Sequence, residues 1–339
     1  MAGAKTSDSG NGPTRHSKRS KAKTLSRSRL ITYVDHQAEN LRATLAKALE
    51  GDVDAIHDAR VATRRLKAVV DLFDEHLSTR LKGRFSESLK RIRRTLGRIR
   101  DLDVMIGHVH EAKDIDAETA GFLLGCLKRE RDDELQMTID LNAAKILGKL
   151  GTWWGLREQI QDDLALSLLR EALAQRLEQF SRQADLHSGI QGESEEEHIV
   201  GALNPHELRI IGKELRYTVE LAAEEGVKFP APVTRTFKRM QDLLGLWHDY
   251  VVLTGKVLEI CVDEQLSYTQ PALLKRSLMF AQASARRSET RLKDFFTLWR
   301  KQGAALKTQI SAALEQAAMP EENVPAADIQ FKEPLTPRA

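Results

Sequence analysis

Two stretches of the sequence place a histidine and three cations on one expected helix face. Both have intervals of three, four and three residues: His57, Arg60, Arg64 and Lys67 in HDARVATRRLK, and His206, Arg209, Lys213 and Arg216 in HELRIIGKELR. At about 100° per residue, the first set falls within an arc of roughly 80°. Guanidinium, ammonium and imidazole groups aligned in this way are suited to binding an anion.

A charged helix face is often only a solvated surface. Such a surface normally carries acids among its cations, because carboxylates at i,i+4 offset the positive charge. These two sets, which we call the first and second cationic rows, contain almost no acids. Unpaired cations four residues apart repel each other. We therefore expect an anionic ligand to bind them.

A second motif follows each row by about 30 residues. LKRIRRTLGRIRDLDV, residues 89–104, aligns without a gap with FKRMQDLLGLWHDYVV, residues 237–252, at an offset of 148 residues. The matched pairs include Lys90 and Lys238, Gly97 and Gly245, Arg100 and His248, and Asp101 and Asp249. A helix pair repeated at about half the chain length predicts two similar helical bundles related by a pseudo-twofold axis. The two cationic rows would then face each other.

The elements that carry these motifs are expected to be helices. Apolar residues recur every three or four positions in stretches such as 30–49 and 235–247, and no sustained two-residue alternation appears. We expect helices at 30–49, 53–78, 83–111, 117–147, 152–184, 197–227, 231–264 and 267–315. Long helices joined by short loops indicate an all-α fold of antiparallel bundles.

Positive charge in this chain is concentrated locally. The 339 residues are 41% hydrophobic and 30% charged, with a net charge of +3. Residues 1–29 carry a net +7, so the remainder sums to −4. We expect residues 1–29 to be a disordered basic tail that can contact nucleic acid nonspecifically, and residues 319–339 to be a disordered Pro-containing tail. The folded region is then 30–315, with bundles at about 30–150 and 152–315.

The cysteine count and the absence of targeting signals concern the compartment. Two cysteines, Cys126 and Cys261, are too few for a disulfide framework and indicate buried thiols in a reducing environment. The N-terminal stretch has no apolar signal region, and no run of about 18 apolar residues occurs. We expect a cytoplasmic protein that does not contact a membrane.

The two motif pairs together resemble the conserved histidine α-helical domain family, called CHAD. The resemblance covers about residues 30–315 and implies two four-helix bundles around a central basic groove that binds inorganic polyphosphate. The residues implied to bind are His57, Arg60, Arg64, Arg65, Lys67, Lys90, Arg93, Arg94, Arg100, His206, Arg209, Lys213, Arg216, Lys238 and His248. Because Gln241 and Asp242 stand where the first half has Arg93 and Arg94, we expect an asymmetric groove with its stronger end in the first half.

Three functional classes are compatible with these features: a polyphosphate-binding protein, a nucleic-acid-binding protein and a polyphosphate-processing enzyme. Aromatic residues are only 5% of the chain, which is few for base-stacking platforms. Glu193, Glu195 and Glu197 in GESEEEH alternate as metal ligands do, but they lack a following lysine and a strand context. No P-loop, nucleophile elbow or paired-histidine metal motif occurs. We expect a non-catalytic polyphosphate-binding protein, without metal or cofactor, that associates with polyphosphate or storage-polymer granules.

Overall fold

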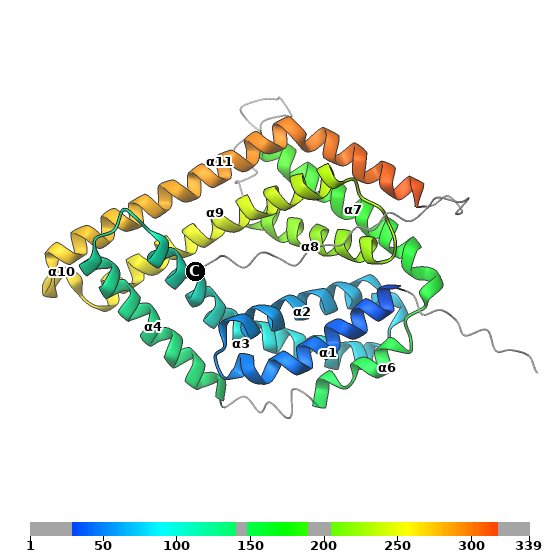
Figure 1. The fold of residues 1–339 in the computed structure, drawn as a ribbon, viewed down its shortest axis with the longest axis horizontal. Helices are drawn as coiled ribbons and strands as arrows, with labels where there is room; N and C mark the ends of the chain where they lie inside the picture. Colours follow the sequence, from blue (N-terminus) through cyan, green and yellow to red (C-terminus); the bar gives the residue numbers. More distant parts are fainter. Residues whose placement is uncertain (1–28, 140–147, 189–204, 318–339) are drawn as a thin grey trace, which may run out of the picture.

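A computed structural model describes residues 29–139, 148–188 and 205–317, and every regular element within these ranges is a helix (Figure 1). The first half contains α1 (Arg29–Leu49), α2 (Val53–Leu72), the short 3-10 helix η1 (Asp74–His76), α3 (Thr79–Glu111) and α4 (Ala117–Ile139). The second half contains α6 (Trp153–Arg157), α7 (Asp162–Ser188), α8 (Pro205–Glu224), α9 (Ala231–Asp263), α10 (Leu266–Thr269) and α11 (Pro271–Gln316). The predicted all-α fold class is confirmed.

Local backbone chemistry sets both ends of α2, the helix that carries the first cationic row. Gly51 has a φ of 94°, which is a conformation that favours glycine, and it ends the turn after α1. The Asp52 side chain then accepts a hydrogen bond of 2.7 Å from the Ala55 amide and caps α2. The predicted helix 53–78 ends instead at Leu72, because buried Phe73 leaves the helical conformation and η1 follows.

Two further predicted helices are each divided. The helix expected at 152–184 is interrupted at residues 158–161, where Ser78 donates its amide proton to the Gln159 side chain over 2.6 Å. The helix expected at 267–315 is divided where Gln270 takes an extended conformation, φ −147°, before Pro271 begins α11. Proline is favoured there because it lacks an N–H that would have no helical partner. The predicted helical stretches 140–147 and 197–204 lie outside the described residues.

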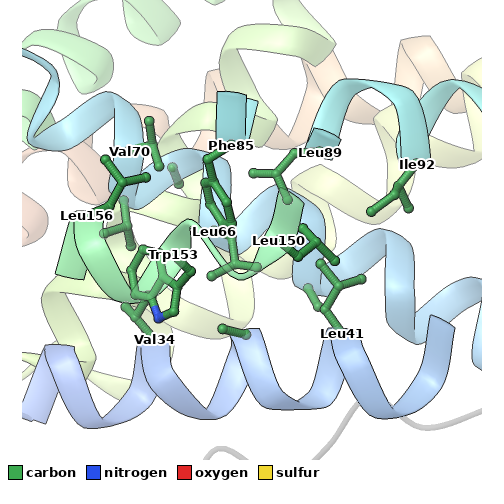
Figure 2. Packing of buried hydrophobic residues seen from close by; sticks show 14 of the residues in the cluster. Val34, Leu41, Leu66, Val70, Phe85, Leu89, Ile92, Leu150, Trp153 and Leu156 are labelled. Atoms are coloured by element: carbon green, nitrogen blue, oxygen red, sulfur yellow. The ribbon is translucent and has the colours of Figure 1, made fainter. Parts of the chain in front are cut away.

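The first core lies between α1, α2, α3 and α6, shown at the bottom of Figure 1 and close up in Figure 2. Phe85 of α3 and Trp153 of α6 lie at its centre, with ring centroids 5.6 Å apart. Asp35 of α1 accepts hydrogen bonds from the Trp153 indole at 3.2 Å and from Arg157 at 2.6 Å. These contacts fix α6 against α1, so the turn between the two halves is part of the first core.

The second core is formed by α7, α8, α9 and the C-terminal half of α11. The Phe180 ring contacts Phe237, Phe295 and Trp299 edge-on, with centroids 5.4–6.3 Å apart. Trp299 donates its indole proton to Asp185 over 2.7 Å, so the buried ring has its polar atom satisfied. The halves are not separate blocks, because α7 contributes Ala165 to the first core and Phe180 to the second.

A third core joins the distal ends of the long helices, on the left of Figure 1. It combines residues of α3 and α4 with residues of α9, α10 and α11: Leu102, Met105, Leu127, Val257 and Phe280 are members. Ion pairs surround it, with Lys256 2.8 Å from Glu130 and Arg129 2.6 Å from Glu264. Helices α3 and α9 therefore each belong to two cores, which fixes their positions relative to each other.

Candidate anion-binding site

Arg60, in the first cationic row, crosses from α2 onto α3. Its Nη1 donates a hydrogen bond of 3.1 Å to the main-chain oxygen of Arg93, and its Nη2 lies 4.0 Å from the Asp101 carboxylate. The guanidinium passes over Gly97, where a Cβ would lie only 2.8 Å from Nη1. Only 14% of the Arg60 side chain is exposed. Arg60 therefore has a structural role as well as a charge at the site.

The second half is built differently at the equivalent place. Gly245 has no atom within 4 Å of the position that a Cβ would take. The Nε of Arg209 is buried, and within the described residues it has no hydrogen-bond partner. Gln241, which matches Arg93, is 9% exposed and belongs to the interior between α8 and α9. The second row therefore presents an arginine whose donors are less fully used.

The two rows lie close enough to influence each other's protonation. Burial lowers the pKa of Lys213 to about 7, and the charges of Arg64 and Arg209 lower it further. Burial and the neighbouring Arg64 lower the pKa of Arg60 to about 10. Arg64 is on α2, whereas Lys213 and Arg209 are on α8. The rows from the two halves therefore form one cluster of cations, with Arg64 acting on both.

Three histidines are associated with this cluster. Burial, followed by the charge of Arg100, lowers the pKa of His57. Burial and Arg209 lower the pKa of His248 to about 4, and its ring centroid is 5.5 Å from that of His206. At neutral pH, His57 and His248 are therefore neutral in the unliganded protein, each with one donor and one acceptor nitrogen.

Two carboxylates from matched positions of the halves lie at the edge of the cluster. Asp101 is 4.0 Å from Arg60, and Asp249 is 3.9 Å from Nε2 of His108. The His108 ring also contacts the Tyr250 ring, with centroids 4.8 Å apart. The negative charge of Asp249 raises the pKa of Lys213 against the larger effect of burial. These carboxylates hold and orient the surrounding cations.

Three predicted site residues are engaged with carboxylates. Lys67 lies 2.6 Å from Asp71, and Glu220 accepts from both Arg65 at 3.2 Å and Arg216 at 2.8 Å. Glu220 thereby ties α2 to α8. Part of this was visible in the sequence, because Asp71 and Glu220 each follow a row cation by four residues. The pairing of Arg65 with Glu220 depends on tertiary structure and has no local signal.

The remaining predicted residues divide by exposure. Arg93 is half-buried beside the cluster, where burial and then Arg64 lower its pKa. Lys90, Arg94 and Lys238 are exposed, and within the described residues their side chains make no hydrogen bond or ion pair. The structure therefore brings Arg93 to the rows but leaves these three cations on the surface.

Tyr217 lies among the cations but was not predicted as a site residue. Burial lowers the pKa of Arg60, Arg93 and Arg209, and the nearby Tyr217 phenol opposes that shift in each. The ring is half-buried and packs against the first core. Its place in the sequence, directly after Arg216 of the second row, was the available signal.

Other chemistry was considered for the described part of the chain. No group of three or more histidine, cysteine or acidic side chains there is arranged to hold a metal ion. The acidic stretch at 192–198 lies outside the described residues. Cys126 and Cys261 are both buried, as expected, and burial raises the pKa of each thiol. No helix in the described ranges has the length and apolar character needed to span a membrane.

Comparisons with known proteins agree with this architecture. The family model of the CHAD domain matches residues 32–257. The solved structure of PptA from Streptomyces chartreusis aligns with a TM-score of 0.54 at 17% identity, covering 80% of this chain and 98% of that one. The crystal structure of the CHAD domain from the plant Ricinus communis aligns with a TM-score of 0.50 at 18% identity, covering 86% and 91%. No curated protein matches the sequence. Because the family model covers most of the chain, the protein belongs to the CHAD domain family.

Proposed function

We propose that the protein binds inorganic polyphosphate, without reacting with it, in a basic groove where the two cationic rows meet. The observation that carries this proposal is the approach of Arg64 on α2 to Arg209 and Lys213 on α8. Like charges are brought together there, and a polyanion would relieve their repulsion. Polyphosphate binding is a known property of CHAD domains, which supports this choice of anion.

The donors of the cluster suit a flexible chain of phosphates. Each internal phosphate carries about one negative charge, and guanidinium groups bind phosphate oxygens through paired donors. Arg209 has a buried Nε without a partner among the described residues, so it has a donor available for such a ligand. Neutral His57 and His248 add hydrogen-bond donors without adding repulsion in the empty site.

Arg64→Glu is the sharpest test of this function. Arg64 is half-buried and its side chain makes no hydrogen bond or ion pair in the described structure, so its replacement should leave the fold intact. Lys293→Glu is the matched control, because Lys293 is exposed on α11 and equally unpaired. Long-chain polyphosphate would be titrated at physiological salt, with heparin and duplex DNA as competitors and circular dichroism to monitor helix content.

We expect Arg64→Glu to weaken polyphosphate binding by about tenfold or more, on the order of one lost charge-assisted contact plus the added repulsion. Lys293→Glu should change it little. Equal affinities in the two variants would return the first row to a solvated face. Ready displacement of polyphosphate by duplex DNA would favour the nucleic-acid alternative.

The non-catalytic and granule-targeting parts of the proposal need separate measurements. Incubation of the protein with polyphosphate should release no free phosphate and should not shorten the chains. In cells that accumulate polyphosphate, a fluorescent fusion should collect on the granules, and the Arg64→Glu fusion should be diffuse. Release of phosphate, or granule localisation that ignores the Arg64 change, would contradict these parts.

A further inference from the structure

A second row of arginines runs along the exposed side of α3. Arg80, Arg84, Arg91 and Arg98, which we call the outer arginine row, fall within an arc of about 40° at 100° per residue. All four are exposed. At 1.5 Å per residue, the row is about 27 Å long. It lies on the same helix as Arg93 but on a different side.

Most of the outer arginine row lacks a negative partner. Within the described residues, Arg98 pairs with Glu134 at 3.1 Å, whereas Arg80, Arg84 and Arg91 have no carboxylate within ion-pair distance. Glu87 lies on the same side of α3 and is exposed, but it forms no ion pair with these arginines. An ordinary solvated face would contain more acids to offset such a row.

The surface between the candidate site and this row is also cationic. Starting from Arg93 beside the first cationic row, Lys90 and Arg94 lie about 60° and 100° further around α3, before the outer arginine row begins. Apart from Glu87, the other residues of residues 83–97 in this sector are glycine or serine. Positive side chains therefore continue around α3 from the site to its exposed side.

We propose that a long polyphosphate chain leaves the groove beside Arg93 and continues over Lys90 and Arg94 onto the outer arginine row. This inference rests on the proposed function and adds a second segment of binding site that only long chains reach. The row would thereby give the protein its preference for long chains.

Ligand stiffness and asymmetry of the halves favour polyphosphate over duplex DNA here. A helix with its side chains is only about 10 Å across, so a ligand following this path must bend sharply. Duplex DNA stays nearly straight over about 150 base pairs, whereas a polyphosphate chain is flexible. On α9, Pro232 and Leu246 stand where α3 has Arg84 and Arg98, so the second half has no equivalent row.

The test compares two doubly charge-reversed full-length proteins. The first carries Arg84→Glu and Arg91→Glu, and the second carries Lys293→Glu and Lys301→Glu at exposed positions of α11. Both variants have the same net charge. Tripolyphosphate and long-chain polyphosphate would each be titrated at several salt concentrations, and duplex DNA would be titrated alongside.

The outer-row variant should bind tripolyphosphate as the parent protein does. For long chains its affinity should fall, and the slope of log affinity against log salt should decrease by about 1.4, or 0.7 for each cation lost from a flexible single strand. The α11 variant should match the parent with both ligands. Equal long-chain binding in the two variants would overturn the inference, as would a loss confined to DNA.

Failure of the proposed function gives a different pattern. If the parent protein binds neither polyphosphate, both the groove and its extension are wrong. If the outer-row variant loses tripolyphosphate as strongly as long chains, the row belongs to the primary site and no separate extension exists.

Discussion

Nη1 of Arg60 lies 2.8 Å from the point where Gly97 would carry a Cβ, and the same nitrogen donates to the main-chain oxygen of Arg93. The matched glycine of the second half, Gly245, has no atom within 4 Å of its Cβ position. Two glycines that align in the sequence thus differ in what they permit. Gly97 leaves room for an arginine, whereas Gly245 faces open space.

Alanine at these two glycines should therefore have different effects. Replacing a glycine inside a helix by alanine stabilises the helix by up to about 1 kcal/mol. We expect Gly245→Ala to gain this amount in unfolding free energy. Gly97→Ala should gain less, because the Arg60 head must move and a hydrogen bond worth about 1 kcal/mol is lost. Urea unfolding measures both, and polyphosphate affinity should fall only in Gly97→Ala. Identical behaviour of the two variants would show that the Arg60 crossing contributes nothing.

Lys213 should make polyphosphate binding depend on pH. Its pKa is about 7 in the free protein, compared with an ordinary 10.5, so it is largely neutral above neutral pH. Bound phosphates favour the charged form and raise this pKa, so binding takes up a proton between the free and bound values. Affinity should therefore rise as pH falls from about 9 towards 7. Calorimetry in buffers of different ionisation enthalpy measures the proton uptake directly.

Lys213→Arg provides the matched control for that experiment. Arginine keeps the positive charge across this pH range, because its pKa is above about 12 in most settings. The variant should bind polyphosphate with less proton uptake and a flatter pH dependence. Long chains are needed, since terminal phosphates titrate near neutral pH. The same proton uptake in both proteins would assign the effect to another group.

Acid should destabilise the empty protein through His248. Its pKa is about 4 in the folded protein and ordinarily 6.5, so the unfolded chain binds more protons between these values. The stability that His248 contributes is present above pH 6.5 and is lost as pH falls towards 4. His248→Gln should flatten the decline in urea midpoint over this window. An unchanged decline would indicate that other groups control it.

Glu220 should be a structural residue and not part of ligand binding. It pairs with Arg65 on α2 and Arg216 on α8, and its side chain is 18% exposed. Glu220→Gln should lower the unfolding free energy by about 1–3 kcal/mol, because it leaves two partly buried guanidinium groups without their shared carboxylate. Polyphosphate affinity should stay the same or increase, since positive charge is released. A loss of affinity at unchanged stability would contradict this role.

The basic N-terminal residues should contribute to binding mainly at low salt. Deleting residues 1–28 should lower the association rate and the salt dependence but leave most of the affinity, because their contacts are screened over about 8 Å at physiological ionic strength. Arg64→Glu should reduce both the salt slope and the affinity that remains at high salt. Loss of nearly all binding on deletion, with binding retained in Arg64→Glu, would contradict a receptor site in the folded region.

The sequence predicted the class of fold and the position of most helices because apolar periodicity is a local property. It also predicted that the two rows would meet, since matched motifs at half the chain length indicate matched helices. Helix ends were less predictable. The early end of α2 depends on the conformation of Phe73, and the division before α11 depends on Gln270. The internal repeat itself stays a prediction.

Other features required tertiary structure. The third core uses apolar residues such as Met105 and Val257, whose periodic spacing shows that they are buried but not against which helix. The sequence likewise showed Arg65 as one more cation, because its partner Glu220 is on a helix of the other half. Exposure separated Lys90 and Arg94 from the other candidates, and a motif match carries no such information.

The third core has a consequence for the energetics of the site. Because α3 and α9 are held together at their distal ends, folding brings the two cationic rows into proximity before any ligand arrives. The binding site is therefore preorganised, and a polyanion does not have to draw two mobile domains together. Their mutual repulsion is instead a load on the folded state, which neutralisation by the ligand removes. Ligand binding and thermal stability are thus linked, so the free protein carries a reserve of stability that appears only when the anion is bound.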